Sequence, residues 1–452
     1  MPKIAFRKLI LLLGDIILLY ASLWLTLFFR YRAPLFHTDS IDNIGEMWEL
    51  HKFPFFLVYV LWIAVFYSAG VYDWERFTAR RIQMLQIVIR PLAMGTLLAM
   101  LIFYFVPAFK ITPKTNLFIN AAIALVLLSL WRIVFVWISS HTSKTNILFL
   151  GSTAEIQKFS KRLSQSPSLG YHIISAAHLG QFNHGNAESI IKESNVDIVV
   201  IEPSVFANQE LVRTFYEILP MGVSVISFPE FYESVTGKIP VSIINEAWFL
   251  ENLIEINKRT FEVIKRLLDI LVAGLLLLPS LALLPLIAIA IKFDSEGPVF
   301  YYQKRVGKGG KSFYFIKLRS MVEGADMLDG TKGNGDDARH TKVGKFLRKT
   351  YLDELPQIIN VFRGEMSFVG PRPERPEYVA ELKKQIPFYE IRLLVKPGLT
   401  GWAQINMADD ASVEDAPEKL QYDLFYIKNR SLLTDLAIML KTTATLARRT
   451  GR

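Results

Sequence analysis

Long apolar runs dominate the first 140 residues of the chain. The four runs cover residues 9–29, 53–72, 91–109 and 117–138. Each run approaches the ~20 residues that a helix needs to cross the hydrocarbon core of a bilayer. The pattern therefore predicts a four-helix transmembrane domain over residues 1–140.

Basic residues flank these runs in a pattern that orients them. Lysine and arginine concentrate in cytoplasmic loops, so their positions indicate which ends face the cytoplasm. They are Lys3, Arg7 and Lys8 before the first run, and Arg76, Arg80, Arg81 and Arg90 after the second. The loop between the first two runs also holds Arg30, Arg32 and Lys52, but acidic residues offset them. We therefore expect a cytoplasmic N-terminus and a chain that returns to the cytoplasm near His141.

A different pattern extends from residue 141 to about residue 250, where short apolar runs alternate with amphipathic stretches. It predicts strands at residues 146–150, 171–177, 197–202 and 223–228, and helices at residues 153–163, 187–194 and 208–219. This alternation is typical of a parallel α/β sheet, here a Rossmann-like domain. The first turn, from Gly151 to Glu155, lacks the three-glycine dinucleotide fingerprint. The sequence therefore favours an empty or regulatory domain over one that binds NAD.

A fifth apolar run spans residues 267–291 and contains Pro279 and Pro285. Proline breaks or kinks a helix. Basic residues lie on both sides of the run: Lys258, Arg259, Lys265 and Arg266 before it, and Lys292, Lys304 and Arg305 after it. Positive charge on both flanks favours both ends in the cytoplasm, which predicts a re-entrant helix that enters the membrane and returns. The alternative is a fifth full crossing, which would place every later motif outside the cell.

Two adjacent carboxylates, Asp353 and Glu354, mark the candidate reactive site. Apolar residues at positions 355, 358, 359 and 362 predict a helix directly after them, with Pro356 in its first turn and Gly364 at its end. Cations surround the pair in sequence: Arg339, Lys342, Lys345, Arg348, Lys349, Arg363, Arg372 and Arg375. This setting suits a reaction on phosphate, with an acid as nucleophile or metal ligand. The structural alternative is a capping box, because Thr350 precedes Asp353 by three residues.

Composition narrows the class of protein. The chain has 452 residues and a net charge of +9, yet 51% of its residues are hydrophobic. This combination excludes a basic nucleic-acid-binding protein and fits a membrane protein with basic cytoplasmic surfaces. The chain has no cysteine, which excludes disulfides, a thiolate nucleophile and a cysteine-ligated zinc.

Several short motifs follow the fifth apolar run. They are QKRVG at 303–307, FIKLRSM at 315–321, DAR at 337–339, VGKFLR at 343–348, MSFVGPRP at 366–373 and KPGLTGWAQIN at 396–406. Together with the acidic pair, and in this order, they closely resemble the bacterial sugar transferases, the monotopic polyprenyl-phosphate phosphoglycosyl transferases. The similarity covers residues 258 to about 446. The N-terminal runs and the α/β domain resemble the long form of that family in architecture.

The resemblance implies a reaction in which a sugar 1-phosphate moves from a UDP-sugar to polyprenyl (undecaprenyl) phosphate, with release of UMP. It also implies Mg²⁺. Asp353 matches the nucleophile that forms a covalent phosphosugar intermediate, Glu354 matches the second acid, and both are implied metal ligands. The implied phosphate- and substrate-binding residues are Lys317, Arg319, Arg339, Arg348, Arg372, Lys396 and Gln404.

The resemblance also implies an architecture and a location. The expected fold is a membrane protein of class α plus α/β, with four transmembrane helices (1–140), a Rossmann-like domain (141–250) and a re-entrant helix with a small α/β catalytic domain (251–452). The catalytic domain would face the cytoplasm at the bacterial inner membrane. Its partners would be a UDP-sugar, polyprenyl phosphate and membrane lipid, without nucleic acid, and a homo-oligomer is left open.

Two features leave alternatives open. Family members commonly carry a Ser-Pro pair at the bend of the membrane helix, whereas this chain has Leu281 and Ala282 there, flanked by Pro279 and Pro285. The run 432–446 fits an amphipathic helix at the membrane surface or a core helix. Two other functions also stand beside the transferase: a glycosyltransferase that moves the sugar alone and releases UDP, and a non-catalytic membrane scaffold or sensor.

Overall fold

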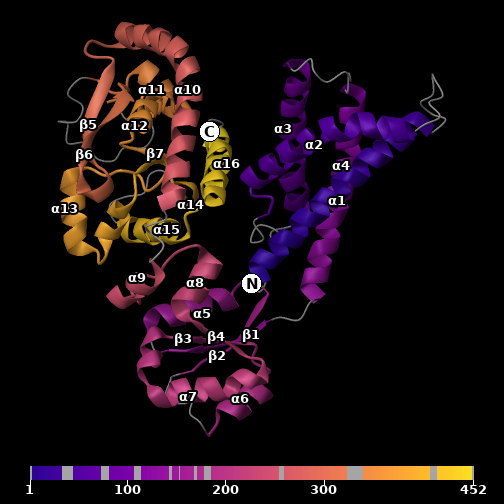
Figure 1. Ribbon diagram of the computed structural model, residues 1–452, viewed down its shortest axis with the longest axis vertical. Coiled ribbons are helices and arrows are strands. Elements are labelled where there is room, and N and C mark those ends of the chain that lie inside the picture. The colour runs from indigo at the N-terminus through magenta and orange to yellow at the C-terminus, as the bar shows by residue number, and fades with distance from the viewer. Residues whose placement is uncertain are drawn as a thin grey trace. The chain divides into compact units, whose positions relative to one another are not determined.

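The computed structural model of the chain describes residues 3–32, 44–72, 81–105, 114–141, 145–151, 153–166, 170–177, 185–253, 259–322, 339–407 and 415–449. It divides into two compact units, Met1–Thr236 and Gly237–Arg452, whose elements are labelled in Figure 1. The segment 237–253 thus belongs to the second unit. The division into parts at residues 1–140, 141–250 and 251–452 stays a prediction.

The predicted apolar runs form long helices in the first unit: α1 (Lys3–Arg32), α2 (Ile44–Ser68), α3 (Arg81–Phe105) and α4 (Lys114–His141). Helices α1 and α3 each pack on both α2 and α4. Three of the helices contain stretches long and apolar enough to cross a membrane: Lys8–Tyr31, Gly45–Ser68 and Thr115–Phe135. The corresponding stretch of α3, Val88–Met100, is shorter, and positions 106–109 of the predicted run lie outside the described residues.

Polar side chains are buried among these helices. Arg132 of α4 binds Asp15 of α1 through two hydrogen bonds of 2.6 and 2.7 Å, and both side chains are almost fully buried. Asn120 of α4 donates to Ser22 of α1 at 2.9 Å and accepts from Tyr59 of α2 at 3.3 Å. Polar and charged groups at membrane depth are costly unless they are paired. These contacts therefore favour one particular pairing of α1, α2 and α4.

The α/β part of the first unit confirms the predicted parallel sheet. Strands β1 (Thr145–Leu150), β2 (Tyr171–Ala177), β3 (Ile198–Ile201) and β4 (Ser224–Ser227) are all parallel, in the order β2-β1-β3-β4. The helices between and after them are α5 (Ala154–Ser164), α6 (Ala187–Glu193), α7 (Gln209–Ile218) and α8 (Phe228–Thr236). The central strand β1 is buried along nearly its whole length, as expected for a parallel sheet.

The second unit combines helices with two small sheets. Strands β5 (Phe300–Val306) and β6 (Ser312–Leu318) form an antiparallel hairpin, and β7 (Ser367–Val369) pairs in parallel with β8 (Gly398–Thr400). The helices are α9 (Glu246–Asn252), α10 (Arg259–Asp294), α11 (Lys342–Thr350), α12 (Gln357–Arg363), α13 (Pro376–Gln385), α14 (Trp402–Asn406), α15 (Ala416–Asn429) and α16 (Leu432–Arg449). One apolar core joins side chains of α9, α13, α15 and α16.

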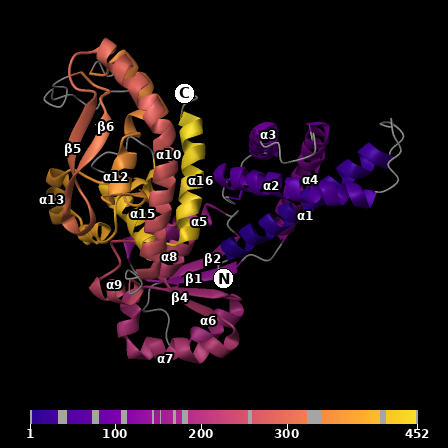
Figure 2. The ribbon, with the colours of Figure 1, turned by 45° about the horizontal axis from the view of Figure 1, so that its top comes forward.

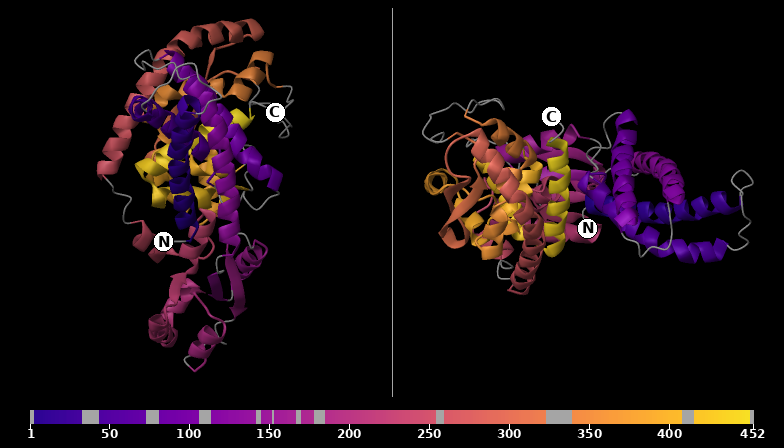
Figure 3. Two further views of the ribbon diagram at one scale, coloured as in Figure 1. Left: turned by 90° about the vertical axis from the view of Figure 1, so that its right-hand side faces the viewer. Right: turned by 90° about the horizontal axis from the view of Figure 1, so that it is seen from above.

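Helix α10 carries the fifth apolar run and is the fourth candidate membrane span. It stays helical across Pro279 and Pro285, but it bends instead of running straight (Figures 1 and 2). Proline produces such kinks because it removes a backbone donor and crowds the preceding turn. Helix α16 lies beside the first half of α10 in Figure 1 and in the right-hand view of Figure 3, and Lys265 of α10 pairs with Asp435 of α16.

Candidate active site

The acidic pair lies in a short turn between two helices. Helix α11 ends at Thr350; the next residue, Tyr351, has a left-handed φ of 57°, and the 3-10 turn Leu352–Glu354 follows. Pro356 then caps α12, which ends at Gly364 with a φ of 89°, as the sequence predicts. Apolar side chains on both sides of the acids, Leu352 and Leu355, pack against two different clusters of the core. The backbone that carries the acids is therefore anchored on each side.

The capping-box alternative is wrong. Thr350 belongs to α11, and its hydroxyl donates to the backbone oxygen of Phe346 at 2.9 Å, one turn back in the same helix. A capping side chain would instead accept a hydrogen bond from a backbone N–H three residues ahead.

Glu354 is held by two cations. Lys317 Nζ of β6 and Arg372 Nη2 of the loop after β7 each donate to Glu354 Oε1 at 2.7 Å. Burial alone would raise the pKa of Glu354, but the charges and hydrogen bonds of Arg372 and Lys317 outweigh it and hold the pKa far below its usual range. Glu354 is therefore ionised at neutral pH. In return, Glu354 raises the pKa of Arg372.

Asp353 has a different environment. Its side chain is buried, and its Oδ2 lies 3.8 Å from Lys317 Nζ. Burial raises the pKa of Asp353 above its usual value; Lys317, Arg348 and Arg372 oppose this rise, and Glu354 adds to it. Adjacent carboxylates whose environments shift their pKa values in opposite directions are suited to different roles.

The predicted site residues divide into two groups in space. Lys317 and Arg372 contact the acidic pair, and Arg348 acts on Asp353 electrostatically while its guanidinium contacts the His340 ring. The others have partners elsewhere. Buried Arg319 donates to the backbone oxygen and the hydroxyl of Ser295 at 2.7 and 2.9 Å.

The remaining three predicted residues have contacts outside the acidic pair. Gln404 donates to the backbone oxygen of Leu399 at 2.9 Å. Burial lowers the pKa of Lys396, and so does the positive charge of Arg266 on α10. Arg339 accepts a hydrogen bond at its backbone oxygen from Val322.

The acidic pair can be tested as a metal site by its donor chemistry. Mg²⁺ takes hard oxygen ligands and is usually held by one or two carboxylates, with waters and substrate phosphates completing its coordination. Asp353 and Glu354 supply two neighbouring carboxylates, and the lowered pKa of Glu354 keeps it ionised at neutral pH. This donor set fits Mg²⁺ with a phosphate substrate. No larger cluster of His, Cys, Asp or Glu that could hold a metal occurs among the described residues.

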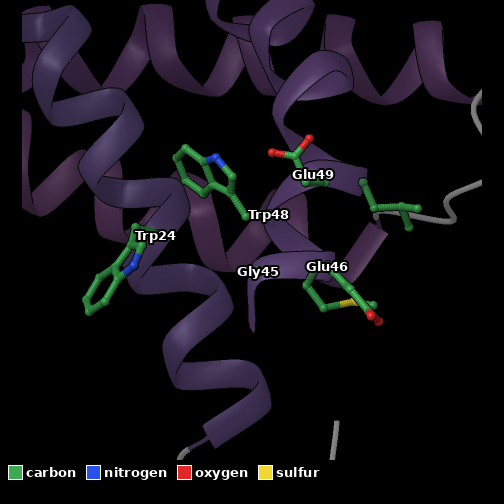
Figure 4. Close-up of a pocket in the computed structure, with 7 residues that line it drawn as sticks. Trp24, Gly45, Glu46, Trp48 and Glu49 are labelled. Carbon is green, nitrogen blue, oxygen red and sulfur yellow. The ribbon is translucent and has the colours of Figure 1, made fainter. Parts of the chain in front are cut away.

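A separate concave region lies on the first unit. Trp24 of α1 and Trp48, Glu46 and Glu49 of α2 border a surface hollow (Figure 4). Trp24 also stacks on Phe28. The hollow contains none of the predicted site residues, so the acidic pair stays the candidate active site.

Sequence reasoning missed a buried ionic network next to the site. Arg392 pairs with Asp423 at 2.9 Å, and its Nη2 donates to the backbone oxygen of Arg372 at 3.0 Å. Both side chains of the pair are almost completely buried. The only signal in the sequence is an arginine and an aspartate within otherwise apolar stretches.

Comparison with known proteins extends these observations. The profile of the family described as "Bacterial sugar transferase" matches residues 260–449. The UDP-N-acetylgalactosamine-undecaprenyl-phosphate N-acetylgalactosaminephosphotransferase of Aeromonas hydrophila is 38% identical over 224 residues, which cover 50% of this chain and 52% of that protein. The UDP-glucose:undecaprenyl-phosphate glucose-1-phosphate transferase of Escherichia coli K12 is 31% identical over 327 residues, which cover 68% of each chain.

The share of each relative's length that the match covers differs between these proteins. A Caulobacter vibrioides protein with the same name as the Escherichia coli relative is 41% identical over 184 residues, which cover 40% of this chain and 69% of that protein. The match to the Aeromonas protein spans only about half of that protein's length. The Escherichia coli match extends well beyond the 190 or so residues of the family profile, into the N-terminal half. The chain belongs to the bacterial sugar transferase family, in a long form with an N-terminal extension.

Proposed function

We propose that this chain is a phosphoglycosyl transferase that moves a sugar 1-phosphate from a UDP-sugar to undecaprenyl phosphate and releases UMP. The observation that carries the proposal is the environment of the acidic pair: Asp353 and Glu354 are adjacent, and Lys317 and Arg372 bind Glu354. The names of the Aeromonas and Escherichia coli relatives state this class of transfer for those proteins. The reaction would begin the synthesis of an exopolysaccharide or another surface glycan.

The first step is a displacement at the phosphorus that bears the sugar. A carboxylate oxygen of Asp353 attacks this phosphorus, and the bond from it to the oxygen that bridges to the uridine phosphate breaks. UMP leaves with that oxygen, and an aspartyl-phosphosugar remains. Asp353 has to be ionised to attack, and Lys317, Arg348 and Arg372 favour its ionised form.

The second step restores the enzyme. An oxygen of undecaprenyl phosphate attacks the same phosphorus, and the bond to the Asp353 oxygen breaks. The product is a polyprenyl diphosphate sugar, and Asp353 is again a free carboxylate. Two transfers through a covalent intermediate divide one difficult step into two easier ones.

Positive charge is needed because a carboxylate attacks a diphosphate that is itself negative. Arg372 suits this task, since the planar guanidinium can bind two phosphate oxygens at once. Lys317 lies between both acids, 2.7 Å from Glu354 and 3.8 Å from Asp353. Mg²⁺, which Asp353 and Glu354 would hold, supplies further charge neutralisation on the diphosphate when it is bound.

The packing of α10 supports a re-entrant helix with the active site at the membrane surface. Arg266 in its first half donates to two backbone oxygens at the end of α12, and Asp294 at its end accepts from the backbone of Val343 in α11. Both ends thus contact the same folded unit. Exposed leucines cover the helix between these ends, at positions 271, 275, 278, 281 and 286, and would face lipid.

The contacts at both ends of α10 also indicate on which side of the membrane the second unit lies. A straight helix of 36 residues would be about 54 Å long and would cross the bilayer, which is incompatible with one folded unit holding both of its ends. We infer that the second unit faces the cytoplasm of a bacterial inner membrane, where the acceptor phosphate lies at headgroup level. Membrane lipid is then a partner of α10.

The test is the identity of the released nucleotide. Membranes that contain the full chain and undecaprenyl phosphate are incubated with uridine-labelled UDP-sugars, including UDP-glucose and UDP-N-acetylgalactosamine. We expect UMP from one of the sugars, together with a lipid-linked sugar diphosphate. Release of UDP would instead indicate transfer of the sugar alone, and absence of turnover with the whole panel would favour a scaffold or sensor.

A further inference from the structure

The loop between β7 and α13 carries Arg372 between two prolines, and every backbone oxygen from residue 371 to residue 374 accepts a hydrogen bond. Backbone N–H groups hold the two outer oxygens. Gly398 of β8 donates to Pro371, and Val306 of β5 donates to Glu374, both at 3.0 Å.

Distant arginine side chains hold the two middle oxygens. Arg392 Nη2 donates to the oxygen of Arg372, and Arg305 Nη1 donates to the oxygen of Pro373, both at 3.0 Å. Proline has no N–H to donate, so Pro371 and Pro373 cannot fix the loop through their own amides. The carbonyl contacts therefore determine how the backbone of Arg372 is oriented.

Arg392 is itself rigidly held. Its guanidinium forms an ion pair of 2.9 Å with Asp423 of α15, and its Nη1 donates to the hydroxyl of Tyr389. The side chains of Arg392 and Asp423 are only 4% and 2% exposed. A charged pair this deeply buried is retained at a desolvation cost, and here it connects α15 to the loop that carries Arg372.

The space on one side of the loop is nearly filled. The free space behind it, lined by Val306, Arg392, Val395 and neighbouring residues, is about 10 Å³, which is about enough for a single water. The Arg372 guanidinium, which binds Glu354, lies at the end of a long side chain. A small rotation of the Arg372 backbone would therefore displace it from Glu354.

We propose that Arg392 is a positioning residue for the transfer reaction: anchored by Asp423 and Tyr389, it holds the backbone oxygen of Arg372 so that the Arg372 guanidinium meets Glu354 and the sugar-nucleotide phosphates. This inference rests on the proposed function for its effect on turnover. Its structural part, the tether of Arg372, does not.

The test removes the tether without leaving a buried charge unpaired. The double variant Arg392→Met with Asp423→Leu replaces both charges by apolar side chains of similar size, an exchange that folded proteins often tolerate. We expect the thermal stability of this variant to be near that of the wild type. We also expect kcat/KM for the accepted UDP-sugar to fall about ten- to a hundredfold, because Arg372 is no longer oriented to form one charged hydrogen bond. Arg392→Lys, which keeps a donor, should recover part of the loss.

A coupling measurement separates positioning from a general structural role. In an Arg372→Ala background, removal of the Arg392–Asp423 pair should cause no further loss, because its effect passes through Arg372. The control is another ion pair of the second unit, Arg430 with Glu262, in which Arg430 is buried and Glu262 is partly exposed; these residues are changed to Met and Leu. The change in kcat/KM that this control variant causes should be the same in the wild-type and in the Arg372→Ala background. Equal losses from the Arg392–Asp423 variant in both backgrounds would overturn the proposal.

A second readout needs no turnover. Amide hydrogen exchange in the full chain should become faster in peptides that cover residues 367–375 when Arg392 and Asp423 are replaced, and should stay unchanged there in the Arg430 and Glu262 control. Unchanged exchange in these peptides would overturn the tether. If no UDP-sugar supports turnover while exchange rises as expected, the proposed function fails and the tether stands.

Discussion

Arg372 donates from Nη2 to Oε1 of Glu354 at 2.7 Å, to the same carboxylate oxygen that Lys317 binds. We predict that Arg372→Ala lowers kcat/KM about ten- to a hundredfold, since a hydrogen bond to a charged group contributes ~1.5–3 kcal/mol. Arg372→Lys should also lose activity, because it keeps the charge but not the planar fork. The control is Arg363→Ala, an exposed arginine at the end of α12. Unchanged kinetics for Arg372→Ala would exclude Arg372 from the site.

The pH dependence of the reaction follows from Asp353. Burial raises its pKa, and protonated Asp353 cannot attack, so activity should fall as the pH drops through a value above that of an ordinary aspartate. The positive charge of Lys317 lowers the pKa of Asp353. Lys317→Met should therefore raise that pKa further and move the acid limb of the pH–rate profile to higher pH.

The matched control for this profile is Lys311→Met, the same substitution at an exposed position of the β5–β6 hairpin. It should leave the acid limb in place. An acid limb that stays fixed in Lys317→Met, or moves to lower pH, would show that Asp353 is not the titrating group.

The topology of α10 can be tested with single cysteines, because the chain has none of its own. Leu250, which is 76% exposed in α9, and exposed Ser312 in β6 lie on opposite sides of α10 in the sequence. We expect Leu250→Cys and Ser312→Cys both to be protected from an impermeant thiol reagent in intact cells and both to react once the membrane is opened. Labelling of position 312 alone in intact cells would mean that α10 crosses the membrane.

The second unit should work without the first. Trp402 donates to the backbone oxygen of Gly237 at 2.9 Å, and the core of the unit includes Ile239, Ile244 and Phe249. A chain of residues 237–452 should therefore fold in detergent or membranes and retain detectable turnover. A chain that starts at Arg259 should be less stable by several kcal/mol, since burial of each large apolar side chain contributes about 1.5–3 kcal/mol.

These two truncations are compared by thermal unfolding and by turnover. Complete inactivity of a folded 237–452 chain would show that the first unit contributes to the reaction. Equal stability of both truncations would show that the segment before α10 does not belong to the core.

Local patterns in the sequence predicted much of the fold. The four parallel strands lie within one residue or so of their predicted positions, because each combines a short apolar run with turn residues on both sides. The limits of α12 at Pro356 and Gly364 were equally predictable, since proline favours a helix start and glycine accepts the left-handed end.

Contacts between distant positions were not predictable in this way. Arg132 and Asp15 are 117 residues apart, and no local pattern links them. Arg319 lies two positions after Lys317, and a continuous strand would place both side chains on one face. Strand β6 ends at Leu318, however, and Arg319 donates to Ser295 while Lys317 binds Glu354. At Thr350 a local pattern was misleading. Its spacing from Asp353 suggests a helix cap, but Thr350 is the last residue of α11.

The central claim is that Asp353 carries the phosphosugar, and mass spectrometry of the protein tests it most directly. The full chain is incubated with the accepted UDP-sugar without undecaprenyl phosphate and digested with trypsin, which releases residues 350–363 as one peptide. We predict that this peptide gains the mass of one sugar phosphate, that undecaprenyl phosphate removes it, and that Asp353→Asn abolishes both the adduct and turnover. Near-normal turnover of Asp353→Asn, or an adduct on another peptide, would contradict the account.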